Sequence, residues 1–131
     1  MTGFGRNKYR AVKVKGCETC GRTHDSKAEA RECAYLHLLM QDPYSEIIHI
    51  DVHPTVTLPG NIRWVLDFCV WQPNGCFGPQ GVECGGKHPV FIDVKGVLTE
   101  GFKLKRKLFD AHHPAAPLVC VKWNRNNRIE L

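Results

Sequence analysis

The stretch PVFIDVKGVLTEGFKLKRK, residues 89–107, combines an apolar segment with charges that such a segment normally excludes. Its first half is rich in β-branched and aromatic residues and ends at Gly96, which predicts a buried strand. Asp93 and Lys95 lie two residues apart in it, so their side chains project from the same face. Because burying a charge is costly unless it is paired or binds a metal, these residues indicate either an ion pair or a functional site.

The 131 residues predict one domain, in which a helix follows this stretch over 99–113 with Thr99 as its cap. A first helix is expected from Ser26 to the Asp42-Pro43 pair. Apolar patterns predict the remaining strands at 11–15, 46–58 with an interruption at Pro54, 62–71 and 117–123. The order β-α-β-β-β-α-β is typical of an α/β or α+β domain with a mixed central sheet. We expect residues 1–10 to form a flexible basic arm, 11–123 the domain and 124–131 a polar tail.

The first helix carries an acid where an apolar residue is expected. Ser26 and Glu29 form a capping-box pattern, which places Glu29 in the first turn. At about 100° per residue, Glu29 falls at the centre of the apolar side of the helix. That side is formed by Cys33, Leu36 and Met40.

Asp67 is a third unexpected charge, because it lies in the middle of the apolar segment IRWVLDFCVW (62–71). Taken singly, Asp67 is best interpreted as a buried, satisfied carboxylate and Asp93 as the partner of Lys95. Together, Glu29, Asp67 and Asp93 would raise one another's pKa values unless a cation neutralised them. Mg²⁺ and Mn²⁺ prefer such hard oxygen ligands, and Lys95 could assist the attacking water. The set therefore indicates phosphodiester hydrolysis.

The formal charge of +5 is concentrated in two basic clusters. Lys8 and Arg10 belong to the amino-terminal arm, whereas Lys103, Lys105 and Arg106 follow the predicted strand. This distribution indicates a polyanionic partner, with nucleic acid favoured over membrane. The absence of a long apolar run or a signal-peptide pattern predicts a cytoplasmic protein.

The segments VLDF, FIDVKG and TEGFKLKRKLF resemble the D…(D/E)xK signature of the PD-(D/E)xK nuclease superfamily. With KYRAVKV, DSKAEA and HP added, the chain is most similar to a family of small phage-encoded proteins in that superfamily. Its relatives include Holliday-junction resolvases of the phage endonuclease I type. The resemblance implies a restriction-endonuclease-like mixed sheet of four to five strands flanked by helices. It also implies that Asp67 and Asp93 bind the metal, that Lys95 is the catalytic lysine and that Glu29 is the acid carried by a helix.

These observations predict a Mg²⁺- or Mn²⁺-dependent DNA endonuclease that acts on branched DNA such as Holliday junctions. Two symmetric cuts imply a homodimer, and phage origin implies the host cell cytoplasm. A non-catalytic, zinc-stabilised DNA-binding protein is one alternative, and a repair or restriction-like nuclease acting on linear DNA is another. His53, which precedes Pro54, is predicted either to lie near the phosphate or to end a strand through a hydrogen bond, and the structural role is favoured.

The seven cysteines are an odd number without a sign of secretion, which favours reduced thiols or a metal site over disulfides. Cys17 and Cys20 have knuckle spacing in the Gly-flanked turn 16–24, and Cys76 and Cys84 lie in the Gly- and Pro-rich loop 72–89. These four cysteines predict a structural zinc site. The substitute ligands would be His24 and His88, and the core cysteines would be Cys33, Cys69 and Cys120. The alternative is a set of reduced surface thiols.

Overall fold

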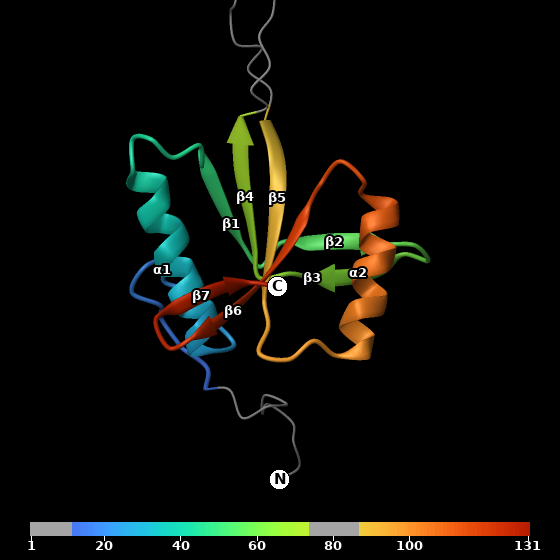
Figure 1. Cartoon of the computed structure of the whole chain (residues 1–131), viewed down its shortest axis with the longest axis horizontal. Helices are drawn as coiled ribbons and strands as arrows, with labels where there is room; N and C mark the ends of the chain where they lie inside the picture. Colours follow the sequence, from blue (N-terminus) through green and yellow to red (C-terminus); the bar gives the residue numbers. More distant parts are fainter. Residues whose placement is uncertain (1–11, 74–86) are drawn as a thin grey trace, which may run out of the picture.

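The computed structural model describes residues 12–73 and 87–131. Two helices, α1 and α2, accompany a mixed five-stranded sheet of order β1-β4-β5-β6-β7 and a separate β2-β3 hairpin, which makes the fold α+β (Figure 1). The elements are α1 (Lys27–Gln41), β1 (His49–Val52), β2 (Thr55–Leu58), β3 (Ile62–Val65), β4 (Phe68–Pro73), β5 (Lys87–Val94), α2 (Glu100–His112), β6 (Leu118–Asn124) and β7 (Asn127–Glu130). Within these ranges, no helix is long and apolar enough to cross a membrane.

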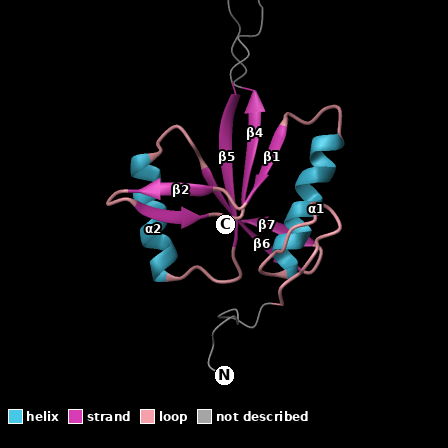
Figure 2. Ribbon diagram, turned by 180° about the vertical axis from the view of Figure 1, so that it is seen from behind, coloured by secondary structure: helices cyan, strands magenta, loops and turns pink. Residues whose placement is uncertain are grey.

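The sheet lies between two layers, with α1 on one side and α2 with the hairpin on the other (Figures 1 and 2). An apolar cluster that includes Leu36, Phe68 and Ile92 joins α1 to the sheet. A second cluster, which includes Trp64, Phe102 and Phe109, joins the hairpin and α2 to the opposite face. Strands β5 and β6 are parallel because α2 connects them as a crossover, whereas the other neighbouring strands of the sheet are antiparallel.

Both predicted helices are confirmed, together with their caps. The Ser26 hydroxyl accepts a hydrogen bond from the backbone N–H of Glu29 at 3.0 Å, and the Thr99 hydroxyl accepts one from that of Phe102 at 3.1 Å. The expected capping box is only half formed, because the Glu29 carboxylate accepts from the backbone N–H of Asp25 rather than from Ser26. The strand break predicted at Pro54 is also confirmed, since it separates β1 from β2.

The prediction of one strand over 62–71 is wrong, because Leu66 and Asp67 separate β3 from β4. The apolar run crosses from one core to the other at this point. Trp64 and Leu66 belong to the cluster around α2, whereas Phe68 and Val70 belong to the cluster around α1. A sequence that is apolar on both sides of the crossing gives no sign of the change of sheet. Asp67 therefore lies between two strands, immediately before β4, instead of inside one.

Two further segments differ from expectation. Residues 12–15 of the predicted first strand make only an isolated bridge, between Val14 and His24. Conversely, part of the predicted polar tail forms β7, which pairs with β6. A buried carboxylate explains the added strand: Glu32 accepts two hydrogen bonds from the Arg128 guanidinium, each 2.9 Å, and one from the Trp123 indole N–H at 2.9 Å.

We expect Arg128→Met to lower the free energy of unfolding by about 3–5 kcal/mol, because Glu32 would remain buried without its counter-charge. Urea denaturation measures this loss. In the double variant Glu32→Gln/Arg128→Met, most of the stability should return, since the neutral amide no longer needs a cation and still accepts from Trp123. Equal stability of Arg128→Met and the wild type would contradict this view of the pair.

Candidate functional site

The three acids singled out in the sequence meet at one end of the β4–β5 pair. Asp67 immediately precedes β4. Asp93 is the penultimate residue of β5, which runs antiparallel to β4. Glu29 arrives from the first turn of α1. Glu29 and Asp93 both lie close enough to the Asp67 carboxyl to shift its pKa. The helix and the two strands therefore place all three carboxyls in a single site, which we call the acidic site.

The acidic site is largely buried, and backbone donors anchor part of it. Glu29 and Asp93 are only 2% and 3% exposed, and Asp67 is half-buried. The N–H of Asp25 lies 2.6 Å from Oε2 of Glu29, and the N–H of Val94 lies 2.7 Å from Oδ2 of Asp67. The carboxyls of Glu29 and Asp67 are thus held in fixed orientations, as a preformed ligand set requires.

The pKa values of the acids reflect this crowding. Burial, followed by contact with Glu29, raises the pKa of Asp67 to about 7. Burial and the nearby charge of Asp67 raise the pKa of Asp93 to about 8. Burial also raises the pKa of Glu29. A bound divalent cation would oppose all three shifts, because it stabilises the ionised carboxylates.

Lys95 follows directly after β5, and its Nζ lies 3.1 Å from Oδ2 of Asp93. The side chain is 32% exposed, and its Nζ also lies 5.0 Å above the ring centre of Phe102. Apart from this ion pair, no donor among the described residues hydrogen-bonds to Oδ2 of Asp93, although the atom is buried. That oxygen is thus available as a metal ligand, while the lysine connects the site to solvent.

His53 also belongs to this site, although the sequence favoured a structural role for it over one near the phosphate. Its backbone N–H donates to the carbonyl of Asp67 at 2.9 Å, which supports that role. Its ring Nε2 lies 3.1 Å from Oε1 of Glu29, and the side chain is 30% exposed. The backbone has a left-handed φ of 56°, which a non-glycine residue keeps only where its surroundings hold it. The signal in the sequence was a histidine placed before proline at the end of an apolar strand.

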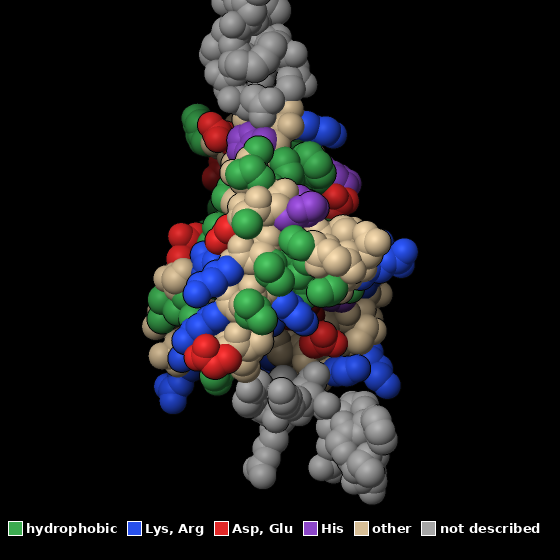
Figure 3. Space-filling model, turned by 90° about the vertical axis from the view of Figure 1, so that its right-hand side faces the viewer, with side chains coloured by type: hydrophobic (Ala, Val, Ile, Leu, Met, Phe, Trp, Pro, Cys, Tyr) green, Lys and Arg blue, Asp and Glu red, His purple; other side chains and the backbone are tan. Residues whose placement is uncertain are grey.

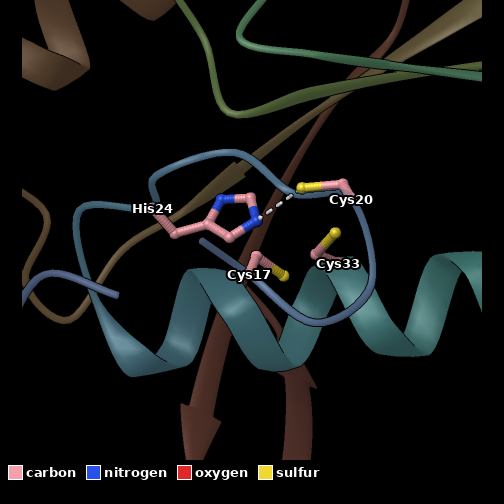
Figure 4. A group of neighbouring side chains, drawn as sticks. All are labelled: Cys17, Cys20, His24 and Cys33. Atoms are coloured by element: carbon pink, nitrogen blue, oxygen red, sulfur yellow. Dashed lines mark hydrogen bonds between the residues drawn. The ribbon is translucent and has the colours of Figure 1, made fainter. Parts of the chain in front are cut away.

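A second group of side chains adjoins the acidic site. The turn before α1 supplies Cys17, Cys20 and His24, and α1 itself supplies Cys33 (Figure 4). The four side chains point toward one another, and their nearest ligand atoms all lie within 4.8 Å of one another. Three of these residues are buried, and Cys20 is partly buried. We call this group the Cys3His cluster.

The Cys3His cluster could hold a structural zinc ion. Three sulfurs and one imidazole nitrogen are a common zinc ligand set, and a tetrahedral site would bring these atoms to about 3.8 Å from one another. Burial tends to raise the pKa of the Cys17 thiol, but hydrogen bonds from the backbone of Cys20 and Thr19 outweigh it and lower that pKa. Such backbone donors stabilise a thiolate, the form that binds zinc.

The cluster contains only part of the predicted zinc ligand set. Cys17 and Cys20 belong to it, and His24 takes the place foreseen for a substitute ligand. Cys33, predicted as a core residue, is fully buried in the core but also points its sulfur into the cluster. Cys76 and Cys84 lie outside the described residues. His88, the other predicted substitute, lies in β5 opposite Gln72, far along the strand pair from Phe68, whose ring contacts His24.

The predicted DNA-binding lysines lie on the outer surface of α2. Lys105 is exposed, and Lys103 makes a 3.4 Å ion pair with Glu100. The Arg106 guanidinium instead donates to the carbonyl of Leu118 at 3.2 Å and contacts the sulfur of Cys120 at 3.3 Å, so it ties α2 to β6. Basic side chains are interspersed with acidic and apolar ones on the face that carries α2 (Figure 3). Lys8 and Arg10 lie outside the described residues.

We expect the protein without divalent cations to lose stability as the pH rises from about 4 to about 8. Because the pKa values of Asp67 and Asp93 rise on folding from 3.8 to about 7 and about 8, the folded state binds more protons than the unfolded state in this window. The free energy of unfolding therefore falls as the pH rises through this window. Denaturation of the wild type and of Asp67→Asn/Asp93→Asn across this range isolates the effect. An equal pH slope in both proteins would contradict it.

Comparison with known proteins identifies one family model, whose description is "Protein of unknown function (DUF1064)" and which matches residues 6–126. The match includes the acidic site, the Cys3His cluster and both helices. None of the curated proteins and none of the solved structures matches the chain.

Proposed function

We propose that this chain, which belongs to the DUF1064 family, is a metal-dependent DNA endonuclease with a restriction-endonuclease-like core. One observation carries the proposal: the buried Glu29 and Asp93 and the half-buried Asp67 converge at the end of the β4–β5 pair with Lys95 beside them. A protein that only binds DNA has no need for three adjacent carboxyls whose pKa values are raised by desolvation and by one another. The resemblance of the LDF and DVKG segments to PD-(D/E)xK nucleases supports the same function.

The acidic site fits Mg²⁺ or Mn²⁺, because its donors are hard carboxylate oxygens and one of them, Oδ2 of Asp93, has no partner among the described residues apart from its ion pair with Lys95. Asp67, Asp93 and Glu29 would hold the ion. When bound, the cation would polarise a phosphoryl oxygen and activate water. The backbone N–H groups of Asp25 and Val94 keep two of these carboxylates in place.

Lys95 would act at the solvent side of the site. Its ammonium group is close to Asp93 and its side chain is partly exposed, so the lysine can reach a phosphate that approaches from outside. There it would orient the attacking water and stabilise the negative charge that develops as one P–O bond forms and another breaks. The contact with Phe102 limits the directions in which the side chain can move.

The proposed substrate is branched DNA, including Holliday junctions, cut by a homodimer in the cytoplasm of a phage-infected cell. Lys103 and Lys105 would contact phosphates, together with Lys8 and Arg10 of the amino-terminal arm. Arg106 can serve this purpose only if it leaves its contacts with β6. Among the described residues, the contacts of Arg106 with β6 favour a role in positioning α2.

Cleavage of matched four-way-junction, flap and linear duplex substrates tests the proposal, with Mg²⁺, with Mn²⁺ or with EDTA. We expect metal-dependent cleavage of the junction and none in EDTA. Cleavage of linear duplex at the same rate would refute the junction preference but keep the nuclease. Tight binding of all substrates without cleavage would refute the nuclease and favour a zinc-stabilised DNA-binding protein.

We expect Lys103→Ala/Lys105→Ala to weaken binding of every DNA substrate and to reduce the slope of log affinity against log salt by about 2, because two phosphate contacts are lost. Binding is measured in EDTA over a range of salt concentrations. Arg31→Ala/Lys122→Ala, which removes two exposed cations from α1 and β6, is the matched control and should leave the slope unchanged. Equal slopes for the two variants would contradict the assignment.

A further inference from the structure

His24 lies between the Cys3His cluster and the acidic site and contacts both. The residue is fully buried. Its Nε2 lies 3.3 Å from the sulfur of Cys20, and its Nδ1 lies 3.1 Å from Oε2 of Glu29. The two nitrogens of one imidazole therefore face two different sites, and each has a specific partner.

Zinc binding would decide which of these nitrogens carries the proton. A neutral imidazole has one N–H, and a nitrogen that binds a metal cannot keep it. A zinc ion held through Nε2 with the three sulfurs leaves the proton on Nδ1, where it donates to Glu29. This carboxylate–histidine–zinc arrangement fixes the ring and strengthens the histidine as a ligand.

Helix α1 carries one residue of each site. Glu29 and Cys33 are four residues apart, so they lie on the same face of the helix, one turn from each other. Glu29 is also held by the Asp25 N–H and by His53, and its carboxyl contacts Asp67. A change at the zinc ligand His24 is thereby transmitted to an acid of the acidic site through a single side chain.

We propose that His24 links the two sites: its Nε2 binds zinc with Cys17, Cys20 and Cys33, and its Nδ1–H holds Glu29 in the orientation that faces Asp67. His24 is then a positioning residue, and the zinc ion orders a carboxylate of the acidic site. The zinc part of this inference does not depend on nuclease activity. The consequence for the acidic site rests on the proposed function.

A competing arrangement uses the same residues. His24, Glu29 and His53 form another group whose ligand atoms lie within 4.8 Å of one another. A metal there would take Nδ1 of His24 and would displace its hydrogen bond to Glu29. The Cys3His cluster offers four ligands instead of three and leaves that hydrogen bond intact, so the structure favours it.

The link is tested by a double-mutant cycle on zinc affinity, measured by competition with a chromophoric chelator. We expect Glu29→Gln to lower zinc affinity about tenfold or more, because the support of the histidine ligand is weakened. His24→Cys keeps four zinc ligands but has no N–H for Glu29, so adding Glu29→Gln should then change affinity by less than about twofold. Asp51→Asn is the matched control, because Asp51 bonds to His49 and Trp71 outside both sites, and it should not alter zinc affinity. An unchanged affinity in Glu29→Gln, or the same loss in both backgrounds, would overturn the proposal.

NMR of the wild-type protein loaded with ¹¹³Cd²⁺ provides a measurement that needs no variant. We expect metal coupling to the His24 ring through Nε2 and a proton on Nδ1. Coupling through Nδ1 would overturn the proposal in favour of the His24–Glu29–His53 group.

Mn²⁺ binding, followed by calorimetry, tests the consequence for the acidic site. In His24→Cys with zinc bound, Mn²⁺ affinity should fall about tenfold, because Glu29 is no longer oriented. Unchanged Mn²⁺ affinity would overturn the positioning role. If the wild type binds no Mn²⁺, the proposed nuclease function fails, whereas the zinc cycle still decides whether His24 joins zinc to Glu29.

Discussion

Asp93→Asn is expected to lower the rate of metal-dependent junction cleavage by about a hundredfold or more. The substitution keeps the size of the side chain but replaces a carboxylate oxygen with an amide nitrogen, which does not bind Mg²⁺. The lost carboxylate is also the ion-pair partner of Lys95 at 3.1 Å, so one substitution changes both the proposed ligand set and the position of the proposed catalytic lysine. Single-turnover cleavage at saturating Mg²⁺ measures the effect.

Stability separates this result from simple unfolding. Since the pKa of Asp93 is raised to about 8, the metal-free Asp93→Asn protein should be at least as stable as the wild type near neutral pH. Asp51→Asn is the matched control, because Asp51 belongs to the same sheet but bonds to Trp71 and His49 outside the site. Its cleavage rate should remain within a few-fold of the wild-type rate. Full activity of a folded Asp93→Asn protein would refute the catalytic assignment.

Removal of zinc is expected to destabilise the protein more than any single substitution. The binding free energy of a structural zinc site is about 10–16 kcal/mol in small zinc-binding peptides, which is comparable to the whole stability of a domain. The Cys3His cluster also ties the turn before α1 to that helix, and the β-pairing of this turn among the described residues is limited to an isolated bridge between Val14 and His24. We therefore expect about one zinc per chain and a large fall in the denaturation midpoint after chelation.

Two cysteine substitutions give a matched comparison for the zinc prediction. Cys33→Ala and Cys69→Ala both truncate a buried cysteine, but only Cys33 belongs to the cluster. Cys33→Ala should lose zinc and most of the stability that zinc supplies, whereas Cys69→Ala should keep zinc and lose about 1 kcal/mol. Protein purified without chelators that contains no zinc, or equal behaviour of the two variants, would contradict a structural zinc site.

The local features of this fold could be predicted from the sequence because they depend on neighbouring residues. The caps at Ser26 and Thr99 and the unusual position of Glu29 follow from spacing along one helix. The convergence of Glu29 with Asp67 and Asp93 was expected from chemistry, since each charge was out of place in an apolar element. Their proposed role in catalysis stays a prediction.

The missed features depend on contacts between distant parts of the chain. Cys33 occupies an apolar helix position, and that pattern is the same for a core thiol and for a zinc ligand. Strand β7 has a polar sequence, and its place in the sheet depends on Arg128 meeting Glu32 from a helix almost a hundred residues earlier. The break at Asp67 separates two equally apolar segments, so only the packing of two different cores reveals it.

The position of Asp67 at the crossing between these two cores also bears on the order of folding. Its carboxyl can lie beside Glu29 and Asp93 only when α1 has packed against the sheet and β4 has paired with β5. The acidic site therefore needs tertiary contacts among three separate elements. A nascent or partly unfolded chain would keep its three acids apart, so any chemistry at this site is confined to the completed fold.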